Sequence, residues 1–175
     1  MKRITLLCLC IFSTIILSGC MSMRTDTQAP EIASDEIPNL AIKQPVTLEN
    51  ASTNPGESVI GKWPGWTVYA DYQKYTESAI GAVKNVFESK NITVNDNAQK
   101  VLKLDVYEAL SEQGMVKFRF TAKMKVVTGS GVQKEFTGIH NYGNGYGTTF
   151  AAERSIAQCV AQMLNDKDIL KYLEE

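Results

Sequence analysis

The chain has few of the residue types from which enzymes build catalytic and metal sites. Its 175 residues include a single histidine, His140, and no recognisable catalytic signature surrounds it. One histidine without a thiolate cluster is a weak basis for a metal site. We therefore expect no enzymatic activity, no metal ion and no cofactor. Catalysis by His140 with Ser155 or Cys159 is the alternative.

Proline is absent from most of the chain. All five prolines fall between residues 30 and 64, in a stretch that is also rich in Ser, Thr, Asn and acidic residues and has no hydrophobic period. Such composition is typical of a flexible linker. It predicts a tether over residues 20–62, long enough to let the domain work away from a membrane. The alternative is that part of this segment packs on the domain, with Val46, Leu48, Val59 and Ile60 as docking points.

Long apolar runs are absent after residue 17, so a transmembrane helix of about 20 residues is not expected there. The start of the chain differs: Lys2 and Arg3 precede an uncharged apolar run over residues 4–17, as in a secretory signal peptide. The sequence Leu17-Ser18-Gly19-Cys20 that follows resembles the lipobox of bacterial lipoproteins. This resemblance implies cleavage of residues 1–19 and lipidation of Cys20, with palmitate-like acyl chains as the membrane anchor. Met21 in place of Asp favours the periplasmic face of the outer membrane. The alternative is an ordinary cleaved signal peptide.

Cysteine is scarce once this processing is taken into account. Cys8 and Cys10 would leave with the signal peptide and Cys20 would be lipidated, so Cys159 alone remains and no intramolecular disulfide is possible. Cys159 lies on the apolar side of a predicted helix, which favours a buried core residue over a reactive thiol.

The net charge of the whole chain is −1, and residues 63–175 hold thirteen basic and thirteen acidic residues. This balance argues against nucleic acid as a partner.

Hydrophobic periodicity predicts an α+β domain over residues 63–175. Apolar residues at helical spacing indicate amphipathic helices over residues 72–89 and from Thr148 or Thr149 to Leu164, and a short helix that ends near Leu173. Alternation indicates strands over residues 101–109, 115–127 and 133–142, joined by short turns. We predict a two-layer sandwich: an antiparallel meander of three to four strands packed by two amphipathic helices.

Two candidate binding surfaces follow from this layout. Alternation along the longest strand places four basic residues on one face, and they are candidates for binding a partner or an anion: Lys117, Arg119, Lys123 and Lys125. The alternative is a solvated face partly neutralised by Asp105 or Glu135. The Gly-rich turn before the last long helix is a candidate recognition loop through Tyr142, Asn144 and Tyr146. The aromatic cluster Trp63, Trp66 and Tyr69 either closes the core edge or forms a contact surface.

Lipobox, proline-containing segment and helix–meander–helix layout together are similar to small envelope lipoproteins of the YajG-like and LptE-like kind. They are also similar to the auxiliary lipoproteins of ABC-type lipid transporters. Residues 151–164 resemble the closing helix of such domains. The resemblance implies a noncatalytic, lipid-anchored accessory or scaffold protein with an envelope protein as partner. The alternative function is a binding module for anionic lipid or lipopolysaccharide that uses the basic sheet face.

Overall fold

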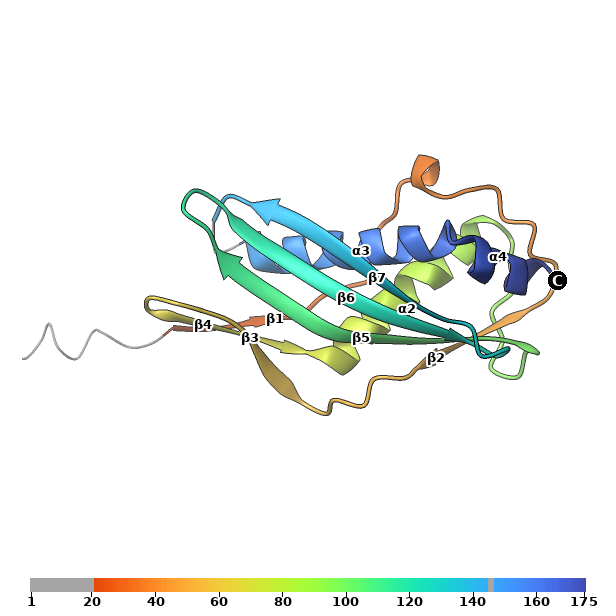
Figure 1. The fold of residues 1–175 in the computed structure, drawn as a ribbon, viewed down its shortest axis with the longest axis horizontal. Coiled ribbons are helices and arrows are strands. Elements are labelled where there is room, and N and C mark those ends of the chain that lie inside the picture. The colour runs from red at the N-terminus through yellow and green to blue at the C-terminus, as the bar shows by residue number, and fades with distance from the viewer. Residues whose placement is uncertain (1–20, 145–146) are drawn as a thin grey trace, which may run out of the picture.

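Strands from both halves of the chain and two long helices form an α+β structure (Figure 1). The computed structural model describes residues 21–144 and 147–175. The predicted signal peptide, Cys20 and Tyr146 lie outside the described residues. No helix within the described ranges is long and apolar enough to cross a membrane.

The larger sheet has the strand order β2-β5-β6-β7. Its elements are β2 (Val46–Asn50), β5 (Lys100–Gln113), β6 (Phe118–Thr128) and β7 (Gln133–Tyr142). The last three form the predicted antiparallel meander, and β2 adds to β5 in parallel. Alternate residues of β6, from Phe120 to Val126, are buried on one face, as their period of two predicted.

Two amphipathic helices cover that inner face, which confirms the predicted two-layer sandwich. Helix α2 (Tyr72–Ser89) has the predicted bounds, and Asp71 caps it by accepting hydrogen bonds from two backbone amides of its first turn. Helix α3 (Thr148–Leu164) buries the predicted apolar stripe, although its N-cap is Gly147 and not a threonine. The short helix α4 (Lys167–Glu174) follows and is capped by Asp166.

The prediction of a flexible tether over residues 20–62 is wrong for the described part of that segment. It holds β1 (Met21–Thr25), the 3-10 helix η1 (Ser34–Glu36), β2 and β3 (Glu57–Trp63). The domain therefore begins well before residue 63. A smaller sheet of order β1-β4-β3 forms around β4 (Trp66–Asp71), with β1 parallel and β3 antiparallel to it. The alternative of a packed segment holds for Val46 and Ile60, which are buried, while Val59 is exposed.

Helix α3 packs tightly against the larger sheet at Gly138 of β7. A Cβ atom there would lie 1.9 Å from the carbonyl oxygen of Ser155, so only glycine fits. The same helix covers the outer edge of β7 with two glutamines. Gln158 Oε1 accepts a hydrogen bond from Ile139 N at 2.8 Å, and Gln162 Nε2 donates to the Thr137 carbonyl at 3.0 Å. Side chains thus occupy edge groups that would otherwise be free to pair with another strand.

Candidate docking surfaces

The outer face of the larger sheet is the side opposite α2 and α3, and it presents alternate residues of β5, β6 and β7. On this face, Thr121 of β6 lies between Leu110 of β5 and Ile139 of β7 in the strand register. These two aliphatic side chains are 40% and 46% exposed. The helices leave this face open, so two large aliphatic side chains are exposed to solvent among mostly polar neighbours.

Two ion pairs lie on the same sheet face as Leu110 and Ile139. Lys123 Nζ lies 2.9 Å from Glu108 Oε1, and Lys125 Nζ lies 3.7 Å from Asp105 Oδ2. Two of the four predicted cations are therefore neutralised across the strands, as the alternative interpretation proposed. Lys117 lies in the β5–β6 turn at the end of this face and not in the strand, because β6 begins at Phe118 and residues 114–117 form the turn. Its predicted place in the strand is wrong.

Asp105 is the buried member of this set, with 7% of its surface exposed. Burial raises the pKa of its carboxyl group, and the charge of Lys125 partly opposes that rise. Its Oδ1 atom has no hydrogen-bond partner among the described residues. Asp105 thus belongs to the packing of the sheet more than to an accessible binding site.

The structure does not support Tyr142 as a recognition residue. Its side chain is 7% exposed, its hydroxyl lies 2.6 Å from Ser111 Oγ, and its ring stacks on Phe118 at a centroid distance of 5.3 Å. Asn144 uses its side chain locally, accepting a hydrogen bond from Gly147 N at 3.1 Å. Tyr146 lies outside the described residues. The described part of the predicted loop therefore serves the fold.

In the described part of the chain, His140 contacts an aromatic ring and Cys159 lies in the core. His140 packs edge-on against Phe150 in the first turn of α3, with 5.6 Å between ring centroids. Cys159 is a buried core residue, as predicted, and burial raises the pKa of its thiol to about 12. No three His, Cys, Asp or Glu side chains within the described residues gather where they could hold a metal ion.

A second surface lies at the end of the domain where the described chain starts; we call it the N-terminal end. It contains Trp63, Lys117 and Arg119, which the sequence analysis named as candidates, together with residues that it did not name. Met21 N donates a hydrogen bond of 2.8 Å to the Gly65 carbonyl in the β3–β4 turn. The neighbouring Trp63 ring lies 5.2 Å from the Phe118 ring, which begins β6 after the β5–β6 turn. The two hairpin turns and the first residue of β1 therefore share one end, and α4 with the C-terminus lies at the other (Figure 1).

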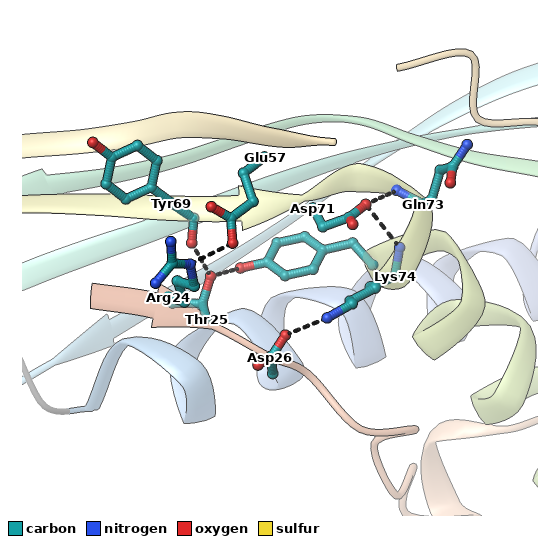
Figure 2. Close-up of polar contacts among 9 residues, drawn as sticks. Arg24, Thr25, Asp26, Glu57, Tyr69, Asp71, Gln73 and Lys74 are labelled. Carbon is teal, nitrogen blue, oxygen red and sulfur yellow. Dashed lines mark hydrogen bonds and ion pairs between the residues drawn. The ribbon is translucent and has the colours of Figure 1, made fainter. Parts of the chain in front are cut away.

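Side-chain contacts fasten β1 to the body of the domain (Figure 2). Arg24 Nε lies 2.5 Å from Glu57 Oε1 of β3, and Lys74 Nζ of α2 lies 3.0 Å from Asp26 Oδ1. Between these exposed ion pairs, Thr25 Oγ1 donates to the Tyr69 carbonyl at 2.9 Å and lies 2.5 Å from the buried Tyr75 hydroxyl. Desolvation raises the pKa of Tyr75, so its hydroxyl stays protonated at neutral pH.

The β5–β6 turn exposes two large apolar side chains. Met115 is 104% exposed and Val116 is 84% exposed. Beside them lies a shallow depression of about 510 Å³, whose polar lining includes Glu112, Lys117 and Arg119. No ion pair of Lys117 or Arg119 is found within the described part of the chain. The turn and the start of β6 thus combine apolar side chains with two cations and one carboxylate, that of Glu112.

Sequence reasoning missed β1, β3 and the exposed tip of the β5–β6 turn for identifiable reasons. Strand β1 has no alternation, because Thr25 is its one buried residue. A usable signal existed for β3: Pro64-Gly65 is a turn dipeptide with apolar residues on both sides, which is typical of a hairpin. The exposed pair Met115 and Val116 was assigned to a strand, although Gly114 directly precedes it.

Comparisons with known proteins find similarity to solved structures and none to a protein family or a curated sequence. No model of a protein family matches the chain, and no curated protein is significantly similar in sequence. The chain is similar to the crystal structure of protein XCC0632 from Xanthomonas campestris, described with the family DUF330. The TM-score is 0.51, the sequence identity 11%, and the match covers 82% of this chain and 92% of that one. At this identity the likeness concerns the fold alone.

Proposed function

We propose that the protein is a noncatalytic accessory lipoprotein of the cell envelope. It is anchored by lipid on Cys20 and docks a protein partner through the outer face of the sheet β2-β5-β6-β7. The observation that carries the docking role is the exposed pair Leu110 and Ile139, which flanks Thr121 and is bordered by ion pairs. An apolar centre with a polar, charged rim is the usual anatomy of a protein interface.

The outer sheet face is a better docking surface than the Gly-rich turn. Tyr142 is held in the core and Asn144 is used within its own turn, so neither offers a side chain that a partner could bind. On the sheet face, in contrast, the aliphatic side chains of Leu110 and Ile139 have no described element packed over them. A rigid strand surface also binds with little loss of conformational entropy, which favours it over a loop.

Binding of anionic lipid or lipopolysaccharide by the sheet face, the alternative function, is less favoured. The carboxylates of Glu108 and Asp105 already neutralise Lys123 and Lys125. An anion would have to compete with these carboxylates for the same ammonium groups. The surplus of positive charge lies at Lys117 and Arg119, at the end of the face and not at its centre.

Site-specific photocrosslinking in cells tests the docking proposal. A photoreactive amino acid is placed at Leu110 or Ile139 of the full chain, and at Lys84 as a matched control, because Lys84 is exposed on α2 on the other side of the domain. We expect one dominant envelope protein to be captured from positions 110 and 139 and not from position 84. Equal capture from all three positions, or none from 110 and 139, would remove the sheet face from consideration.

The lipid anchor is tested in the same cells. Metabolic labelling with a clickable palmitate analogue should mark the wild-type chain, and Cys20→Ala should abolish the label and release the protein from the membrane fraction. A Cys20→Ala variant that stays membrane-bound and labelled would contradict anchoring through Cys20.

A further inference from the structure

We propose that the N-terminal end of the domain rests directly on the bilayer that holds the lipid anchor, with the β5–β6 turn in contact with lipid. This inference rests on the proposed lipidation of Cys20. The apolar contacts would come from Met115 and Val116 and the phosphate contacts from Lys117 and Arg119.

The first support is the position of β1 relative to the anchor. Strand β1 begins at Met21, one residue after Cys20, and consecutive Cα atoms are about 3.8 Å apart. No spacer therefore separates the lipid from the folded domain. The ion pairs of Arg24 and Asp26 and the buried hydrogen bond of Thr25 tie this strand to β3, β4 and α2. A lipid on residue 20 would bring the whole end of the domain to the membrane surface.

The second support is the kind of side chain that this end exposes. Met115 and Val116 stand at the tip of a hairpin, and Met21 is also exposed at the start of β1. Trp63 and Trp66, which flank the adjacent β3–β4 turn, are half-buried. Tryptophan is enriched where proteins meet the interfacial region of a bilayer, and protruding aliphatic side chains can enter the acyl boundary. These residues gather at the one end that the anchor would hold against lipid.

The third support is charge. Lys117 directly follows the apolar tip, Arg119 lines the depression beside it, and Lys62 is exposed on β3 near the other turn. Glu112 also lines the depression and faces Arg119 in the strand register, so the surplus is positive but not complete. Cations that flank an apolar tip match the phosphates of a bilayer surface, where basic residues are favoured by anionic lipid.

The opposite end of the same meander supplies a matched control. Strand β6 separates the β5–β6 turn from the β6–β7 turn, which contains the exposed Ser130. At about 3.3 Å per residue, the eleven residues of β6 place the two turns more than 30 Å apart. A contact with lipid at one turn is then incompatible with a similar contact at the other.

The test uses the full, acylated chain in vesicles of phosphatidylethanolamine and phosphatidylglycerol. Val116→Cys and Ser130→Cys are labelled with a polarity-sensitive NBD maleimide, and Cys159 stays unlabelled because it is buried with a raised pKa. We expect the emission of the label at position 116 to shift to shorter wavelength and to be quenched by spin-labelled lipid. The label at position 130 should show neither effect. Lys117→Glu with Arg119→Glu should reduce the shift at position 116.

The outcomes separate this inference from the proposed function. Mass spectrometry of the same preparation reports acylation of Cys20. An acylated protein whose label at position 116 behaves like that at position 130 overturns the lipid contact and leaves the anchored accessory protein standing. A shift at position 116 in native membranes but not in vesicles also overturns it, because a protein would then cover the turn. If the chain is not acylated, both the lipid contact and the lipid-anchored accessory function are refuted.

Discussion

Helix α3 packs tightly against the larger sheet at Gly138, and a single methyl group there tests the packing of the two layers. The Cβ atom of an alanine would lie 1.9 Å from the Ser155 carbonyl oxygen and 2.7 Å from its carbonyl carbon. An unstrained contact needs about 3.5 Å. Helix and strand would therefore have to separate by roughly 1.5 Å, and no side-chain rotation can relieve the clash because both atoms belong to the backbone.

Overpacking of a core costs about 1–3 kcal/mol, and more where the backbone must move. We expect Gly138→Ala to lower the free energy of unfolding by about 3 kcal/mol. The reason is that residues of α3 near Ser155, such as Ile156 and Cys159, are fully buried and would lose contacts together. Urea unfolding followed by the fluorescence of Trp63 and Trp66 measures the change. With a slope of about 1–3 kcal/mol per molar urea, the midpoint should fall by about 1–3 M with the slope unchanged.

Gly143→Ala is the matched control. No described atom lies within 4 Å of a Cβ at that position, so the substitution should be neutral or stabilising by less than about 1 kcal/mol. Equal midpoints for Gly138→Ala and Gly143→Ala would refute the close approach of α3 to β7. The fold would then need a different packing of helix on sheet.

Two further changes probe the attachment of β1 and the buried carboxylate. Tyr75→Phe removes the hydrogen bond with Thr25, so we expect a loss of about 1 kcal/mol in unfolding free energy and faster amide exchange in β1. Tyr69→Phe is the control. Unchanged amide exchange in Tyr75→Phe would show that this bond does not hold the strand. Because the folded pKa of Asp105 is raised, wild type gains stability as the pH falls through that pKa toward the ordinary value of 3.8. The advantage of Asp105→Asn over wild type, measured by urea unfolding, should therefore shrink from pH 7 to about pH 4, and an advantage that grew on acidification would be inconsistent with the raised pKa.

The elements that periodicity could predict are those with one buried face and enough length to show it. Helix α2 has the predicted bounds. Strand β6 shows its alternation from Phe120 to Val126 because α3 covers one of its faces while the other face contacts water. In both cases the pattern is set by the residues of the element itself.

Two of the missed strands, β1 and β2, owe their structure to partners that are distant in the sequence. In β2, directly after Pro45, Val46 is fully buried, yet the strand has five residues and pairs with β5 more than fifty residues away. In the candidate site, Tyr142 looked like a surface aromatic next to glycines. Its burial depends on Ser111 and Phe118, which no local pattern connects to it. Tertiary contacts of this kind override local composition.

The attachment of β1 also determines how the domain would carry a mechanical load applied at its N-terminus. Strand β1 runs parallel to β4, and Met21 lies at the outer end of the pair. A pull on the preceding residue along the strand axis therefore slides β1 past β4. The backbone hydrogen bonds, the Arg24–Glu57 and Asp26–Lys74 ion pairs and the Thr25–Tyr75 contact are loaded together in shear, instead of opening one after another. Tension at this end is thus shared by β3, β4 and α2.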